Sequence, residues 1–236
     1  MNTDIAVILC RPQLGENIGL AARAMGNFGI KDLRIVCPRD PWPNTNAIHA
    51  SVSAREIVDK AGVFCSLKEA IADLEWALCT TARPRYLKKS VYALKDTPSL
   101  FQAHPFKKIG FVFGPEQAGL TNEEISLCNG SIYIETSPDC PSLNLSHAVL
   151  LCMYELARVT NTHPIQESSA EMREVFSLLS YLELSLEKNG FFSPEEKRDK
   201  MKQNLRDIFL RRPLSVHDVN TLFGVFRCLG KPGDSL

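Results

Sequence analysis

The stretch GENIGLAARAMGNFG (15–29) follows a short apolar run, IAVILC (5–10), and the two together have the pattern of a strand leading into a helix. Gly19, Arg23 and Gly26 share one face of this helix, because they recur at helical spacing. The opposite, core-facing side is apolar: Leu20, Ala21, Ala24, Met25 and Phe28. Since glycine inside a helix costs about 1 kcal/mol relative to alanine, the two glycines predict close approach by another backbone or by a ligand.

The glycine spacing does not match the common nucleotide-binding loops. A dinucleotide loop has G-x-G-x-x-G after the first strand, whereas this segment has Gly15, Gly19 and Gly26. The G-K-[ST] of a P-loop is also absent. A dinucleotide oxidoreductase is therefore disfavoured. Asn17, at the start of the helix, is compatible with a helix N-cap.

Short apolar runs alternate with helical patterns on both sides of this segment. The predicted strands are 5–10, 33–37, 76–81, 109–113 and 131–135, with a weaker one near 63–65. The predicted helices are 17–28, 47–59, 67–74, 122–128 and 143–158. Apolar strands between helices are typical of a parallel sheet covered on both faces. We expect an α/β domain over 1–160, a polar linker over 161–169, and a small all-helical extension of about three helices over 170–236.

Charge and cysteine content narrow the function classes. Lys and Arg number 27, as do Asp and Glu, so net charge gives no signal for nucleic acid. Basic residues nevertheless cluster in 83–108 and 197–212, which suits a phosphate backbone and a solvated surface equally well. The eight cysteines form no C-x-x-C pair, so we expect buried free thiols and no metal site.

The chain carries no membrane or export signal that we recognise. No apolar run approaches the roughly 18 residues of a membrane span. The N-terminal MNTDIAVILCRP lacks the basic region and cleavage site of a signal peptide. We therefore expect a cytoplasmic protein with no membrane partner.

One loop with polar residues follows the predicted strand 109–113. The segment GPEQAGL (114–120) contains Gly114, Glu116 and Gly119 in a tight turn. Ligands of parallel α/β sheets bind at the edge formed by the carboxyl ends of the strands. The loop is therefore a candidate for a binding site.

A second such loop follows the predicted strand 131–135. In SPDCPSLNLS (137–146), Ser142 and Asn144 precede a long apolar helix. Taken alone, each of these two residues is compatible with a helix cap. Like the loop 114–120, this segment follows the carboxyl end of a predicted strand.

Three stretches, taken in order, resemble the three motifs of the SpoU/TrmH branch of the SPOUT methyltransferases. They are N-x-G-x-x-x-R (17–23), F-G-x-E-x-x-G-L (113–120) and S-L-N-L-S (142–146). The resemblance covers the whole α/β part, and the helical extension resembles that of the TrmJ subfamily. It implies a C-terminal trefoil knot in the α/β domain and an obligate homodimer whose active site is shared between subunits.

The resemblance also implies a reaction. Members transfer a methyl group from S-adenosylmethionine to the ribose 2′-hydroxyl of tRNA, here at cytidine or uridine 32, the first nucleotide of the anticodon loop. The alternatives are a ribosomal RNA 2′-O-methyltransferase of the same family and a non-catalytic RNA-binding module. The intact Arg23, Glu116 and Asn144 argue against the module, and only the extension favours tRNA over ribosomal RNA.

The resemblance assigns roles to individual positions. The expected catalytic residues are Arg23, Asn17, Glu116, Ser142 and Asn144. The expected cofactor contacts are Thr80, Thr81, Ala82, Gly114, Ile134, Ser142 and Leu143, and the expected RNA contacts are Arg23, Arg83 and Arg85. Because arginine stays protonated and is a poor base, Arg23 is expected to bind a phosphate and orient the 2′-hydroxyl. Asn17, Glu116 and Asn144 are expected to hold Arg23 and the substrate.

Overall fold

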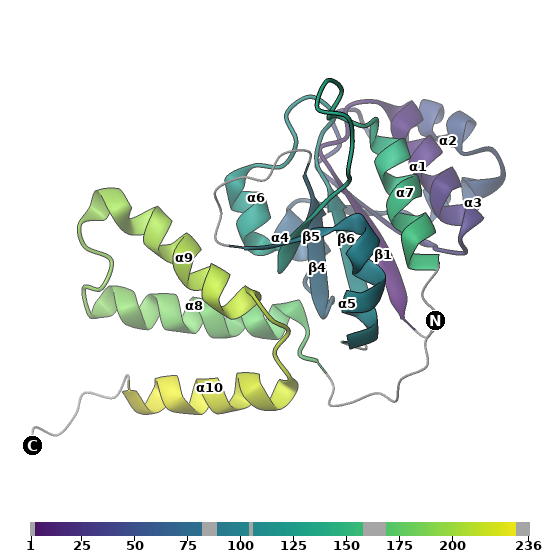
Figure 1. Ribbon diagram of the computed structural model, residues 1–236. Coiled ribbons are helices and arrows are strands. Elements are labelled where there is room, and N and C mark those ends of the chain that lie inside the picture. The colour runs from purple at the N-terminus through teal and green to yellow at the C-terminus, as the bar shows by residue number, and fades with distance from the viewer. Residues whose placement is uncertain (1–2, 82–88, 104–105, 158–168, 230–236) are drawn as a thin grey trace, which may run out of the picture.

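The computed structural model describes residues 3–81, 89–103, 106–157 and 169–229 (Figure 1). Its strands form one seven-stranded sheet in the order β3-β2-β1-β6-β4-β7-β5, and every pair of neighbours is parallel. The strands are β1 (Asp4–Cys10), β2 (Asp32–Val36), β3 (Gly62–Phe64), β4 (Trp76–Thr80), β5 (Ser90–Ala93), β6 (Lys108–Phe113) and β7 (Gly130–Tyr133). The predicted parallel α/β fold is confirmed.

The helices follow the predicted order with two differences. They are α1 (Gly15–Asn27), α2 (Thr45–Ser51), α3 (Arg55–Asp59), α4 (Leu67–Ala70), α5 (Thr97–Ala103), α6 (Asn122–Leu127), α7 (Leu145–Ala157), α8 (Met172–Lys188), α9 (Arg198–Leu210) and α10 (Val216–Leu229). The predicted helix 47–59 is broken into α2, a 3-10 turn at Val52–Ala54, and α3. The sequence interpretation also missed β5 and α5, which lie inside the basic stretch 83–108.

Alternate residues of β1 point into two separate cores. Val7 and Leu9 pack among residues of α1, α3, α5 and α7 on one face of the sheet. Ala6 and Ile8 point to the other face, where α4, α6 and the first half of α8 pack. Figure 1 shows α8, α9 and α10 extending away from this second face. The helical extension therefore helps to cover the sheet, and its first helix belongs to the same core.

Backbone hydrogen bonds strengthen this attachment of α8. The N–H groups of Met172 and Arg173 donate to the carbonyl oxygens of Leu74 and Ala72, at 2.6 Å each. The first N–H groups of a helix have no partner within the helix, so these two bonds satisfy them. The start of α8 is thus fixed to the segment between α4 and β4.

Helix α1 packs closely against α2 at Gly19. A Cβ atom on Gly19 would lie 2.3 Å from the carbonyl oxygen of Ala47, so the predicted close approach is made by the backbone of α2. The prediction for Leu20 is wrong, because its side chain is 40% exposed. Helix α1 contacts α2 on one side and α7 on another. The part of its surface that carries Leu20 and Arg23 stays exposed.

The cysteine prediction is only half right. All eight cysteines are free, as expected. Cys10, Cys79, Cys128 and Cys152 are buried, but Cys37, Cys65, Cys140 and Cys228 are exposed. Among the described residues no group of His, Cys, Asp and Glu side chains is arranged to hold a metal ion. Within the same residues, no helix has the length and apolarity needed to cross a membrane.

Candidate active site

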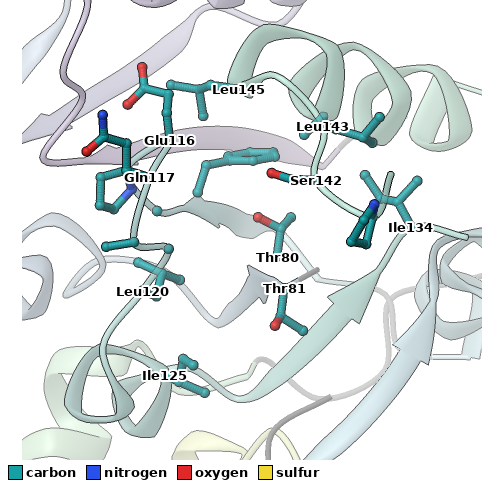
Figure 2. A pocket seen from close by; sticks show the side chains of 17 residues that line it. Thr80, Thr81, Glu116, Gln117, Leu120, Ile125, Ile134, Ser142, Leu143 and Leu145 are labelled. Atoms are coloured by element: carbon teal, nitrogen blue, oxygen red, sulfur yellow. The ribbon is translucent and has the colours of Figure 1, made fainter. Parts of the chain in front are cut away.

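A pocket of about 370 Å³ opens at the carboxyl ends of β4, β6 and β7 (Figure 2). Three loops form it: the end of β4, the loop 114–120 after β6, and the segment between β7 and α7. Six of the predicted cofactor contacts line this pocket: Thr80, Thr81, Gly114, Ile134, Ser142 and Leu143. The predicted Ala82, Arg83 and Arg85 lie outside the described residues.

The pocket wall combines apolar side chains with a few hydroxyls. Ile134, Leu143 and Leu145 contribute apolar surface. Figure 2 shows the Thr80 and Ser142 side chains between the loops. The Thr80 hydroxyl donates to the carbonyl oxygen of Val112 at 3.3 Å, so it also joins β4 to β6. An apolar pocket with a few polar groups is typical of a small-molecule site.

Gly114 is required by the loop that forms one wall of the pocket. The chain folds back after Pro115, and the N–H of Gly119 donates to the Pro115 carbonyl oxygen at 2.9 Å. Gly119 itself has a φ of +66°, which favours glycine. A Cβ atom on Gly114 would lie 2.5 Å from the backbone nitrogen of Leu120. The close approach expected at Gly114 is therefore made by the loop's own backbone.

A hydrogen-bonded network joins the three motifs beside the pocket. The Asn17 side-chain amide donates to Glu116 Oε1 at 2.7 Å. The Asn144 amide donates in turn to Asn17 Oδ1 at 3.0 Å. Asn144 Oδ1 accepts from the Ser146 hydroxyl at 2.7 Å and from the Ser146 N–H at 2.9 Å. The backbone N–H of Gln13 completes the network by donating to Glu116 Oε2 at 3.2 Å.

This network changes the expected role of its members. Arg23 is exposed on α1, and no hydrogen bond or ion pair within the described part of the chain engages its guanidinium. Within one chain, Asn17, Glu116 and Asn144 therefore bind one another and not Arg23, and their expected role in holding Arg23 stays a prediction. The three side chains hold one another, and so fix α1, the loop 114–120 and the start of α7 together. The predicted catalytic residues thus fall into the network of Asn17, Glu116 and Asn144, Ser142 in the pocket, and Arg23 apart from both.

Asn17 and Asn144 were both compatible with helix caps, but only Asn144 caps a helix in the structure. The N-cap of α1 is Leu14, so Asn17 lies inside the first turn, and its amide is used by the network. Asn144 accepts from the backbone of Ser146 and so caps α7 while it also binds Asn17. Ser146, which is buried, was not predicted as a site residue. The Asn-x-Ser spacing before a helix was the signal that would have found it.

Arg11 is a second residue near the site that the sequence did not indicate. Its guanidinium forms a two-pronged ion pair with Glu124 of α6. Burial raises the pKa of Glu124, but the hydrogen bonds from Arg11 and Thr121 outweigh it, so the pKa lies below its usual value. Glu124 also completes the predicted capping box with Thr121. The pair joins the residue after β1 to α6, the helix whose Ile125 lines the pocket.

Comparisons with known proteins agree on one family. The profile of the SpoU rRNA Methylase family matches residues 4–154. The tRNA (cytidine-2′-O-)-methyltransferase TrmJ of Methanocaldococcus jannaschii is 34% identical, over 94% of this chain and 98% of its own. The tRNA (cytidine/uridine/adenosine-2′-O-)-methyltransferase TrmJ of Pseudomonas aeruginosa is 32% identical, over 94% and 91%.

A solved structure supports the same assignment. The crystal structure of TrmJ from Z. mobilis is similar with a TM-score of 0.88 and 38% identity, over 96% of this chain and 99% of that one. This similarity includes the helical extension as well as the sheet, because it covers nearly the whole chain. The three motifs that meet at the pocket are those on which the sequence resemblance rests. The chain therefore belongs to the SpoU rRNA methylase family, and within it the chain is TrmJ-like.

Proposed function

We propose that the protein is a tRNA 2′-O-ribose methyltransferase that uses S-adenosylmethionine and modifies cytidine or uridine 32 of the anticodon loop. The observation that carries the proposal is the meeting of the three family motifs at one site: the second and third motifs line the pocket, and Asn17 of the first is hydrogen-bonded to both beside it. The Methanocaldococcus and Pseudomonas relatives, which align over nearly the whole chain, are both named as tRNA 2′-O-methyltransferases. The helical extension is included in that alignment, which favours tRNA over ribosomal RNA.

The pocket suits S-adenosylmethionine in size and chemistry. Its volume of about 370 Å³ lies within the usual range for small-molecule sites. Ile134, Leu143 and Leu145 offer apolar surface for an adenine ring, and the backbone of the surrounding loops offers N–H and C=O groups for its edge. When bound, S-adenosylmethionine supplies an electrophilic methyl group. We place the cofactor contacts at the six predicted residues that line the pocket.

The other predicted site residues have separate roles in the proposed reaction. The network of Asn17, Glu116 and Asn144 holds the two pocket loops against α1, and so fixes the geometry in which the methyl group and the ribose meet. Arg23 is exposed and has no hydrogen-bond or ion-pair partner among the residues that the structure describes, and a guanidinium is suited to bind a phosphate and orient the neighbouring 2′-hydroxyl. A substrate phosphate then takes the proton. Ser142 lies in the pocket and positions the cofactor or the nucleotide.

We also propose that the active enzyme is a homodimer. Leu14 and Leu20 of the α1 region, and Leu150, Leu151 and Tyr154 of α7, are between 37% and 51% exposed. Helices α1 and α7 pack against each other, so these side chains belong to neighbouring elements. A second copy of the chain would cover this surface. Arg23 lies on the same exposed stripe of α1 as Leu20, so the dimer would bring Arg23 toward the partner's pocket.

A mixed dimer tests this arrangement. Arg23→Ala subunits keep an intact pocket, and Gly114→Ala subunits keep an intact Arg23. If the site is shared, co-refolding the two inactive variants in equal amounts restores about a quarter of wild-type activity, since half of the dimers are mixed and each has one complete site. Sedimentation should give twice the 26.3 kDa of the chain. Activity that stays at the level of the separate variants would mean that each subunit contains its own site.

Three further assignments belong to this proposal. The order β1-β6-β4-β7-β5 inserts later strands between earlier ones, which supports a trefoil knot in the C-terminal part of the α/β region. We divide the chain into a methyltransferase region over 1–160, a linker over 161–169 and the helical extension over 170–236. The enzyme is expected in the cytoplasm, where its tRNA substrate is found.

A methyl-transfer assay tests the proposed reaction. The protein is mixed with S-adenosylmethionine and unmodified tRNA, and the digested product is analysed by mass spectrometry. We expect 2′-O-methylcytidine or 2′-O-methyluridine in the anticodon-loop fragment. If methylation occurs with ribosomal RNA and not with tRNA, the protein is a ribosomal RNA 2′-O-methyltransferase. RNA binding without any product would identify a non-catalytic module instead.

A further inference from the structure

A buried ion pair connects the helical extension to the α/β part. The Lys89 ammonium, just before β5, lies 3.5 Å from Oδ1 of Asp207 on α9, and their side chains are 2% and 4% exposed. A second buried link lies beside it. The side chain of Asn129 donates to the carbonyl oxygen of Leu210 at 3.3 Å and accepts from the N–H of Ala77 in β4 at 2.8 Å. The last turn of α9 is therefore attached to the sheet by buried polar groups.

The same ammonium also holds the end of α6. Lys89 Nζ donates to the carbonyl oxygen of Ser126 at 2.7 Å and to that of Cys128. Carbonyl groups in the last turn of a helix have no partner within the helix, so a donor at this place stabilises the helix end. Lys89 thus joins three elements: α6, the start of β5, and α9 of the extension.

Helix α6 reaches from this junction to the cofactor pocket. It has six residues, and its first turn follows directly on the loop 114–120. Ile125 is 3% exposed and lines the pocket, one residue before Ser126. Packed protein interiors transmit small displacements, because few voids are available to absorb them. A shift at the C-terminal end of α6 is therefore transmitted to the pocket wall.

We propose that Lys89 and Asp207 are positioning residues, through which the docked extension sets the position of α6 and thereby the affinity of the pocket for S-adenosylmethionine. The identity of this ligand rests on the proposed function. Neither residue touches the pocket. Their effect passes through the Ser126 and Cys128 carbonyl groups.

The carboxylate keeps the ammonium in place. Burial lowers the pKa of Lys89, and Asp207 acts in the opposite direction. Without the carboxylate, a charged ammonium at this depth is strongly disfavoured. Lys89 then either loses its proton, which replaces the charge-assisted hydrogen bonds to the α6 carbonyl groups with weaker neutral ones, or turns toward water, which removes the donor. In both cases the hydrogen bonds between Lys89 and the α6 carbonyl groups weaken, so removal of Asp207 is expected to shift α6.

The experiment compares two isosteric substitutions on the extension. Asp207→Asn removes the carboxylate of the buried pair. Glu183→Gln is the matched control, because Glu183 of α8 pairs with Arg206 of α9 at 2.9 Å, inside the extension. Calorimetry measures the Kd for S-adenosylmethionine well below the unfolding temperature. We expect Asp207→Asn to raise Kd by about five-fold or more, the usual lower range of coupling between sites, and Glu183→Gln to change it by less than about two-fold.

A second variant covers the case in which Asp207→Asn does not fold. In Lys89→Met/Asp207→Leu the pair is replaced by apolar side chains, a change that is often neutral or stabilising. This variant lacks the donor to α6, so the same rise in Kd is expected. Variants that bind with wild-type Kd, whatever their melting temperature, would show a structural attachment only and overturn the inference. Absence of binding by the wild-type protein would instead refute the proposed function.

Discussion

Replacement of Arg23 by alanine is expected to lower the methyl-transfer rate by about 100-fold or more, the usual cost of losing a group that stabilises charge in the transition state. The Kd for S-adenosylmethionine is expected to stay within about two-fold, because Arg23 does not line the pocket. Single-turnover transfer to tRNA and calorimetry with the cofactor measure the two quantities separately. Both should be measured on protein of the same oligomeric state.

Two further variants show whether the loss of rate is specific to the position and to the guanidinium group of Arg23. Arg55→Ala removes another exposed arginine, which pairs with Asp59 on α3 at 3.3 Å, and should leave the rate unchanged. Arg23→Lys keeps the charge but loses the planar fork, so an intermediate rate is expected. A normal rate for Arg23→Ala would remove this residue from the mechanism. The network around Asn17 would then carry the site alone.

The Gly114→Ala variant is expected to lose most of its affinity for S-adenosylmethionine. The new Cβ would lie 2.5 Å from the Leu120 nitrogen and 2.6 Å from the Gly119 carbonyl carbon, and both are backbone atoms that cannot turn aside. The loop 114–120, which lines the cofactor pocket, must therefore move, and a displacement of about 1 Å at an active site can lower a reaction rate on the order of 100-fold. We expect an increase in Kd of that order, measured by calorimetry.

A second glycine provides the matched control for this variant. Gly224 lies in α10, and a Cβ atom there would meet no atom within 4 Å. Gly224→Ala should leave the Kd unchanged and stabilise the protein by up to about 1 kcal/mol through helix propensity. Equal Kd values for the two variants would contradict the role given to Gly114. The melting temperatures show whether any loss at Gly114 is local to the loop.

The sequence predicted the central sheet well because its strands are apolar on both faces. The runs at β1, β4 and β6 lie between clear helical patterns, so their type and order could be predicted. The strand β5 was missed, since Ser90–Ala93 offers only four residues and follows a strongly basic segment. The break at Val52–Ala54 was missed as well. Val52 has a φ of +48°, and nothing in its residue type indicates a turn.

The site was predicted through motif resemblance, and its internal contacts were not. The motifs indicated that Asn17, Glu116 and Asn144 belong together, but only their positions in space show that they bind one another and leave Arg23 apart. The pair of Lys89 and Asp207 could not be predicted either. The two residues are 118 positions apart, and lysine and aspartate in basic or polar segments are normally solvated.

Because α8 and the sheet share one hydrophobic core, the helical extension and the α/β part are expected to unfold together. Met172, Val175, Phe176 and Leu179 fill the face of the sheet that Ala6 and Ile8 present. Stripping the helices from that face would open a hydrophobic surface under the central strands, so the sheet and the extension are expected to melt in a single cooperative transition. A polypeptide that stopped after α7 would carry this bare surface into solution and would tend to aggregate.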